Sequence, residues 1–139
     1  MFKHILVPTD FSENSVHTLE IAVNIAQLSQ GRVSLLHVIK IIPNTAFEEF
    51  ADFYKKLERR AEQEMKQLLK PYQHQPVRVE SVIVYGNRVQ EILRFTTDQA
   101  VDLIVMDSHR IDLSDPGHGW GTISYKVSVL AQCPIMLIK

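Results

Sequence analysis

The chain has 139 residues, of which 45% are hydrophobic and 22% are charged, with one cysteine. This length suits a single domain with its own core, and its apolar runs are too short to span a bilayer. Fifteen basic and sixteen acidic residues leave no basic surface of the kind that nucleic acids require. Cys133 alone cannot form an internal disulfide or a thiolate zinc site. We therefore expect one domain over residues 1–139, in the cytoplasm, without nucleic acid or membrane partners.

The chain begins with a strand and a helix. Residues 3–7 form a short apolar run that predicts a buried strand, and this strand leaves the sheet at residues 8–10. Ser12 then offers a side-chain oxygen as a helix N-cap, and apolar residues recur at helical spacing up to Gly31. Gly31 stands where a left-handed residue is expected to end the helix. Residues 33–38 predict the second strand.

A long helix and a third strand follow. One apolar stripe at steps of three and four residues predicts the helix, and its members are Phe50, Tyr54, Leu57, Ala61, Met65 and Leu68. Pro71 is expected to end it. Residues 77–85 are rich in β-branched side chains and predict a strand that closes on Gly86-Asn87. A helix over 89–98 is expected after this turn.

The last third of the chain contains one irregular segment. Residues 101–106 are almost uninterruptedly apolar, which is typical of a central strand covered on both faces. Residues 107–121 then show neither helical nor strand periodicity, although connections in α/β units usually have about two to six residues. Such length favours a functional loop. A helix over 122–131 and a strand over 135–138 complete the pattern.

Strands that alternate with helices predict an α/β fold: an open, mostly parallel five-stranded sheet with helices on both faces. The expected strand order is 3-2-1-4-5, which places the first and fourth strands side by side where the winding reverses. Ligands of open α/β sheets bind at this point, beyond the carboxyl ends of the strands. The segments 8–12 and 107–121 would face the crevice there, and the second is the long irregular one.

The chain resembles the universal stress protein family over roughly residues 2–139. The stretch 5–12, ILVPTDFS, is similar to that family's opening, and 101–106 is similar to its fourth strand. Ser108-His109 matches the middle of the family's loop, and 121–127 resembles its Gly-Ser-Val-Ser-Glu-Lys-Val segment. Cys133-Pro134 before an apolar strand is also typical of that family. The resemblance implies a small cytosolic stress-response regulator that forms a homodimer through its last strand.

In many members of that family the crevice holds an adenine nucleotide, so the resemblance implies ATP or AMP as the ligand and leaves Mg²⁺ open. It implies that Asp10 contacts the adenosine, that Val38 and Met106 flank the base, and that Thr122 and Ser124 contact phosphates. The full set of candidate nucleotide-binding residues is Pro8, Thr9, Asp10, Val38, Met106, Ser108, Arg110, Gly121, Thr122 and Ser124. Structural roles stand beside these: Asp10 as a loop residue, Thr122 as an N-cap, and the two apolar side chains as core.

The loop departs from the family's Gly-x2-Gly-x9-Gly-Ser/Thr pattern. Asp107 and Arg110 replace the first two glycines, and Gly121-Thr122 follows ten intervening residues instead of nine. A carboxylate repels phosphate, whereas an arginine can donate to it. The loop also holds Asp112, Asp115 and two histidines, but their spacing matches no established metal motif. We therefore expect a degenerate phosphate loop and assign no metal.

The sequence contains no nucleophile elbow, no Walker loop and no cysteine beside a base, so we expect a binding protein and not an enzyme. The leading hypothesis is a stress-response regulator that binds an adenine nucleotide or a related small anion in this crevice. The alternative is a dimeric adaptor that binds no nucleotide and acts through protein partners. A slow phosphohydrolase is the third hypothesis.

Overall fold

The computed structural model describes residues 1–108 and 122–139. The strands are β1 (His4–Pro8), β2 (Arg32–Lys40), β3 (Val79–Gly86), β4 (Leu103–Asp107) and β5 (Ile135–Ile138). The α-helices are α1 (Ser15–Ser29), α2 (Ala51–Leu69), α3 (Arg88–Asp98) and α4 (Ile123–Leu130), and short 3-10 turns flank α2 at Phe47–Phe50 and Lys70–Tyr72. No helix in these described ranges is long and apolar enough to cross a membrane.

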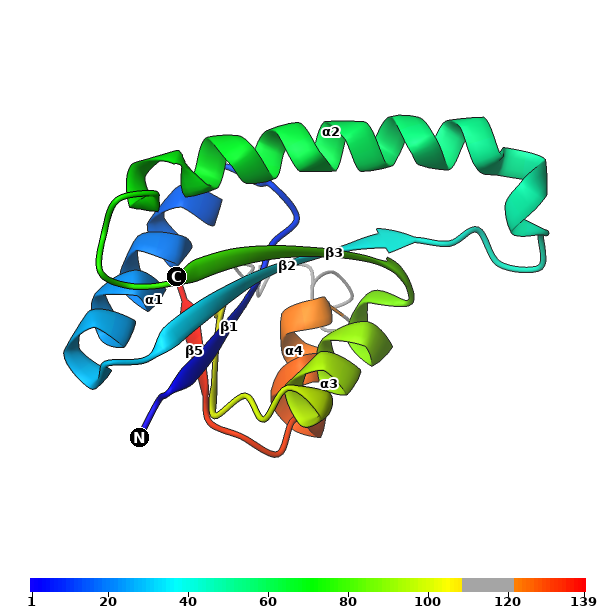
Figure 1. Cartoon of the computed structure of the whole chain (residues 1–139). Coiled ribbons are helices and arrows are strands. Elements are labelled where there is room, and N and C mark those ends of the chain that lie inside the picture. The colour runs from blue at the N-terminus through cyan, green and yellow to red at the C-terminus, as the bar shows by residue number, and fades with distance from the viewer. Residues whose placement is uncertain (109–121) are drawn as a thin grey trace.

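The five strands form one sheet in the order β3-β2-β1-β4-β5, and every neighbouring pair is parallel (Figure 1). This confirms the predicted fold class and strand order. β1 lies in the middle, with Val7 opposite Leu35 of β2 and Leu6 opposite Ile104 of β4. Since β2 and β4 lead away from β1 on opposite sides, the winding reverses beside β1, and the carboxyl ends of these strands share one edge of the sheet.

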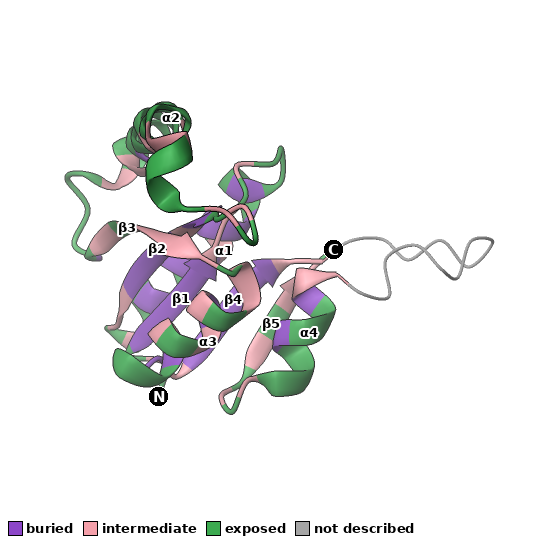
Figure 2. Cartoon of the chain, turned by 90° about the vertical axis from the view of Figure 1, so that its right-hand side faces the viewer, coloured by how far each residue is buried: buried purple, intermediate pink, exposed green. Residues whose placement is uncertain are grey.

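Helices cover both faces of the sheet, with α1 and α2 on one side and α3 and α4 on the other (Figure 1). Successive side chains of a strand point to opposite faces of the sheet, so β1 contacts both helical layers. Ile5 packs in the cluster that contains Leu19 of α1, whereas Leu6 packs with Ile92 of α3 and Val127 of α4. The central strands β1, β2 and β4 are consequently buried between two helical layers, whereas β3 and β5 are only partly buried (Figure 2).

Two predictions at the ends of α1 were wrong. The helix begins at Ser15 after Asn14, and the Ser12 hydroxyl donates to Asp107 instead of capping the helix. At the other end Gln30, and not Gly31, adopts the left-handed conformation, with φ of 58°. Gly31 is required for a different reason, because a Cβ there would lie 2.3 Å from the carbonyl oxygen of Phe2.

The other boundaries differ from the predictions by at most two residues, and β5 has its predicted bounds. Thr122 accepts a hydrogen bond from the amide of Tyr125 at 3.3 Å, so its predicted role as N-cap of α4 is confirmed. Asn87 caps α3 in the same way, through the amide of Gln90. β4 begins at Leu103 because the residue before it, Asp102, uses its carboxylate to accept the amides that begin β1.

Candidate functional site

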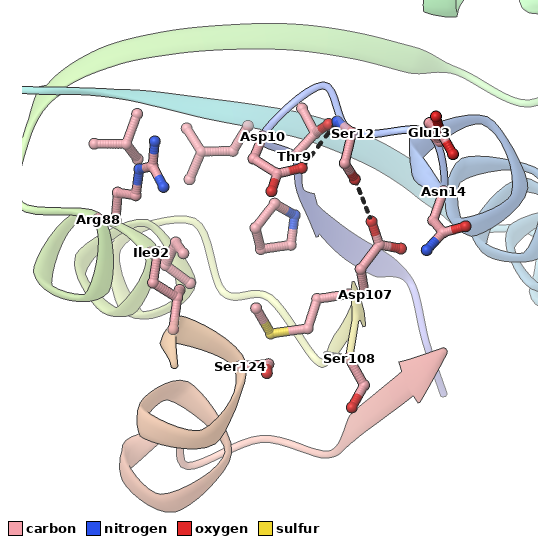
Figure 3. A pocket seen from close by; sticks show the side chains of 15 residues that line it. Thr9, Asp10, Ser12, Glu13, Asn14, Arg88, Ile92, Asp107, Ser108 and Ser124 are labelled. Carbon is pink, nitrogen blue, oxygen red and sulfur yellow. Dashed lines mark hydrogen bonds between the residues drawn. The ribbon is translucent and has the colours of Figure 1, made fainter. Parts of the chain in front are cut away.

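A pocket of about 390 Å³ opens at the carboxyl ends of the central strands (Figure 3). Its volume falls in the usual range of small-molecule sites. The first turn of α3 and the start of α4 complete its walls. The structure brings seven predicted residues together in its lining: Pro8, Thr9, Asp10, Val38, Met106, Ser108 and Ser124.

The other three predicted residues are not in that lining. Thr122 is the cap of α4, and its hydroxyl lies 3.1 Å from that of Ser124, which does line the pocket. Arg110 and Gly121 lie outside the described residues. Val38 and Met106 are each 5% exposed and belong to the core cluster under α3 and α4, so these side chains form both core and pocket wall.

The turn between β1 and α1 is held by its own polar side chains. The Asp10 carboxylate accepts the amide of Ser12 at 3.0 Å, and the Thr9 hydroxyl accepts the amide of Phe11 at 3.1 Å. The same hydroxyl lies 2.9 Å from that of Ser15, the first residue of α1. Phe11 takes a left-handed conformation, with φ of 61°, which costs energy for a side chain of this size. These hydrogen bonds hold the turn in that conformation and fix the pocket wall that the turn forms.

Asp10 carries a negative charge at this wall. Partial burial acts to raise the pKa of its carboxyl, but the hydrogen bonds from Ser12 and the positive charge of Arg88 lower the pKa below its usual value. Its side chain is exposed and points toward the pocket interior (Figure 3). Asp10 is therefore ionised near neutral pH and can accept hydrogen bonds from a ligand.

His37 supports the same turn from the neighbouring strand β2. Its Nδ1 donates to the carbonyl oxygen of Thr9 at 2.8 Å, and its ring lies on Phe11 with centroids 4.2 Å apart. Burial lowers the pKa of His37, and the charge of Arg88 acts in the same direction, against the raising effects of Thr9 and Asp10. The imidazole is thus kept neutral in the folded protein and serves as a hydrogen-bond donor below the turn.

Asp107 ends β4 at the far side of the turn. Its carboxylate accepts hydrogen bonds from the hydroxyl of Ser12, at 3.2 Å, and from that of Thr18 in α1. Thr18 is almost fully buried, so this carboxylate links the end of β4 to the first turns of α1. The negative charge nevertheless stays in the lining of the pocket.

Two lining residues that sequence reasoning missed belong to α3: Arg88 and Ile92. The signal that could have found Arg88 is its position, since it comes two residues after the carboxyl end of β3. All strands of a parallel sheet end at the same edge, so the start of every following helix is a candidate for the site. Figure 3 shows Arg88 and Ile92 on one side of the pocket, and Asp107 and Ser108 on the other.

A metal centre finds no support in the described ranges, where no three His, Cys, Asp or Glu side chains are grouped to hold an ion. The predicted polar residues of the long loop, His109, Asp112, Asp115 and His118, lie outside those ranges. The thiol of Cys133 is half-buried, and this burial raises its pKa. A thiol of this kind is a poor nucleophile at neutral pH.

A five-stranded parallel sheet with a pocket at its switch point defines an α/β domain of the kind that binds ligands at this place. Comparison with known proteins specifies the class. The chain matches the universal stress protein family over residues 1–139. It is 32% identical to universal stress protein MJ0577 of Methanocaldococcus jannaschii, over 100% of this chain and 96% of that protein. It is 28% identical to universal stress protein YxiE of Bacillus subtilis, over 100% of both chains.

The solved structure of MJ0577 shares the fold with a TM-score of 0.83 at 31% identity, covering 100% of this chain and 96% of that one. This chain belongs to the universal stress protein family.

Proposed function

We propose that this protein is a cytoplasmic stress-response regulator that binds an adenine nucleotide or a related small anion in the pocket between β1 and β4. The observation that carries the proposal is the pocket itself, which gathers seven candidate residues from segments far apart in the sequence. It offers apolar walls at Val38 and Met106 together with a carboxylate and hydroxyls at Asp10 and Ser124. A purine nucleoside needs both kinds of surface.

Structural neighbours give further support. A universal stress protein from Archaeoglobus fulgidus has been solved in complex with dAMP, and its fold matches this one with a TM-score of 0.71 at 17% identity. Another universal stress protein has been solved in complex with cAMP, with a TM-score of 0.67 and 17% identity. At this level of identity the neighbours share the fold alone. Their ligands make adenine nucleotides the first compounds to test.

Two measurements test nucleotide binding. Mass spectrometry of the gently denatured protein should detect a released nucleotide, and calorimetry should detect the binding of added AMP. Asp10→Ala should weaken the binding of AMP by at least about 1 kcal/mol, because a charged hydrogen-bond acceptor is lost. Asp98→Ala is the control, because Asp98 is exposed at the end of α3 and lies outside the pocket. No release and no binding of AMP would refute the proposal.

We also propose a homodimer in which β5 pairs with its copy. β5 lies at an edge of the sheet and exposes Met136, and the helix that precedes it, α4, exposes Val129 and Leu130. An apolar edge of this kind would otherwise favour aggregation. Light scattering should give about twice the chain mass of 16.0 kDa. Met136→Lys should give monomers. Leu28→Lys is the control and should stay dimeric, because Leu28 is exposed on α1, away from β5 in the sequence.

The same apolar surface favours the second candidate function, a dimeric adaptor that binds no nucleotide. A dimer that neither releases nor binds a nucleotide would support the adaptor. A monomer that binds AMP would instead separate ligand binding from assembly and refute the role of β5.

A further inference from the structure

The outer edge of β3 carries backbone groups that have no partner among the described residues. β3 is the last strand on its side of the sheet and pairs only with β2. The amide of Val33 donates to the carbonyl oxygen of Arg78, and the amide of Ile41 donates to that of Gly86. Backbone groups along a strand face its two sides in turn. Residues 79, 81, 83 and 85 therefore direct their amides and carbonyls away from β2.

A groove of about 290 Å³ lies beside this edge, between β3 and α2. Figure 1 shows α2 running along β3. The groove is lined by three of the residues with outward backbone groups and by apolar side chains of α2 and the turn that follows it: Val79, Ser81 and Ile83, then Met65, Leu69 and Tyr72. Its volume is at the lower limit of small-molecule sites. It therefore suits one or two apolar side chains better than a whole ligand.

The groove is acidic toward the carboxyl end of β3. Burial raises the pKa of Tyr85 in this part of the strand, and the carboxylates of Glu58 and Glu62 raise it further. Both carboxylates belong to α2 and lie close to Tyr85, and Glu62 also lines the groove. A positively charged group of a ligand is favoured at this end.

The other end of the groove is basic. α2 leads back along the sheet from β2 to the start of β3, so its last turn lies near Val79 (Figure 1). Lys66 lines the groove there, and Lys70 follows at the end of the helix. Both are exposed. Glu20 of α1 acts together with burial to raise the pKa of Tyr72, but it lies outside the groove lining.

We propose that the outer edge of β3 binds an extended peptide segment of a partner protein, which adds to the sheet as an antiparallel strand. The backbone of the segment pairs with the outward groups of β3, and alternate apolar side chains enter the groove, as in other sites that an edge strand and a helix form together. Antiparallel pairing is slightly more stable per residue than parallel pairing. In this direction the amino end of the segment meets Glu58 and Glu62, and its carboxyl end meets Lys66.

The charges of the groove define the partner segment: a basic residue, then alternating apolar residues, then an acidic residue, all on one face of the strand. This surface is distinct from the nucleotide pocket and from β5, which lies at the opposite edge of the sheet. A partner can therefore bind β3 whether or not the pocket is occupied.

The probe is the blocked peptide acetyl-Lys-Thr-Val-Thr-Val-Thr-Glu-amide, which places lysine, both valines and glutamate on one face. Its control has the same composition with lysine and glutamate exchanged. Calorimetry at low ionic strength should give a dissociation constant below about 100 μM for the probe. The exchanged peptide should bind at least about threefold more weakly, because its charges meet like charges.

Ser81→Pro tests the pairing of the edge. The amide of Ser81 points away from β2, so proline removes an outward donor and leaves the β2–β3 ladder intact, as edge strands tolerate. The probe should bind this variant at least about tenfold more weakly. Ser81→Thr is the matched control, since threonine keeps the amide and suits a strand, and it should bind as the parent does.

Lys66→Glu tests the charges without changing the sheet. It should weaken the probe and strengthen the exchanged peptide, so that the preference of the parent is lost or reversed. Lys56→Glu is the control, because Lys56 is exposed on the same helix and lies outside the groove lining. It should leave both affinities nearly unchanged.

No binding of the probe to the parent at about 1 mM would overturn the inference. So would equal affinity for the two peptides, or undiminished binding to a Ser81→Pro variant that circular dichroism shows to be folded. If Ser81→Pro does not fold, Lys66→Glu decides. Light scattering covers the remaining occupant: a lower mass for folded Ser81→Pro than for the parent would assign this edge to a second copy of the chain and overturn the proposal.

Discussion

The support that His37 gives to the β1–α1 turn can be removed without removing its ring. In His37→Phe the contact with Phe11 is kept, but the hydrogen bond of 2.8 Å to the Thr9 carbonyl is lost. An acceptor left without its donor in a partly buried place costs about 1–3 kcal/mol. With a urea slope of about 2 kcal/mol/M, the unfolding midpoint should fall by roughly 0.5–1.5 M.

The effect should also depend on pH. Burial holds the pKa of His37 below its usual value, so the folded state prefers the neutral ring. The stability that this provides is present above a pH of about 6.5, and it is lost as the pH falls through the lower pKa of the folded protein. Phenylalanine does not titrate. The difference between the parent and His37→Phe should therefore shrink between pH 7 and about pH 5.

Urea titrations of both proteins at the two pH values measure this difference. His17→Phe is the control, because His17 is exposed on α1 and forms no hydrogen bond with any described residue. It should change the free energy of unfolding by less than about 0.5 kcal/mol. An equal gap between the parent and His37→Phe at both pH values, or no loss of stability at pH 7, would refute the role given to this histidine.

Further expectations concern stability and ligand charge. Gly31→Val should destabilise the fold by at least about 2 kcal/mol in urea titrations, because its Cβ would meet the Phe2 carbonyl oxygen at 2.3 Å. Asp102→Asn should cost about 1–3 kcal/mol at pH 7, since the carboxylate accepts the amides of Lys3 and His4. Although burial acts to raise the pKa of Asp102, these bonds lower it, so the deficit should shrink only as the pH falls below about 4, through the lowered pKa of the folded protein. In calorimetry without Mg²⁺, ATP should bind more weakly than AMP, because each added phosphate meets more repulsion from the acidic lining, and Mg²⁺ should reduce the gap.

The fold could be predicted because its signals are local and repeated. Each strand is a short and mostly apolar run, and the predicted strand order rests on the alternation of strands with helices. The ends of elements were less predictable, since they depend on contacts between distant segments. Ser12 carries the usual signal of an N-cap but donates to Asp107, which lies 95 residues away. Gly31 carries the usual signal of a C-cap, yet what matters is its lack of a Cβ, because the carbonyl oxygen of Phe2 lies where a Cβ would be.

The lining of the candidate site could likewise be predicted only in part. Residues next to β1 and β4 could be located from the sequence, because the strand order brings these two strands together. Arg88 and Leu36 could not, because they follow or belong to strands on the other side of β1, where the resemblance named only Val38. The width of a pocket across three strands depends on side-chain lengths and directions, which spacing in the sequence does not supply.

The bonds of Asp107 to Ser12 and Thr18 have a consequence for the thermodynamics of binding. They join the end of β4 to the start of α1 before any ligand arrives, so the wall at this end is already ordered. Immobilising a flexible side chain on binding costs roughly 0.5–1.5 kcal/mol, and a wall that is already ordered avoids this cost. Most of the entropy lost on association should then come from the ligand and from lining side chains, such as Arg88, that have no hydrogen-bond partner among the described residues.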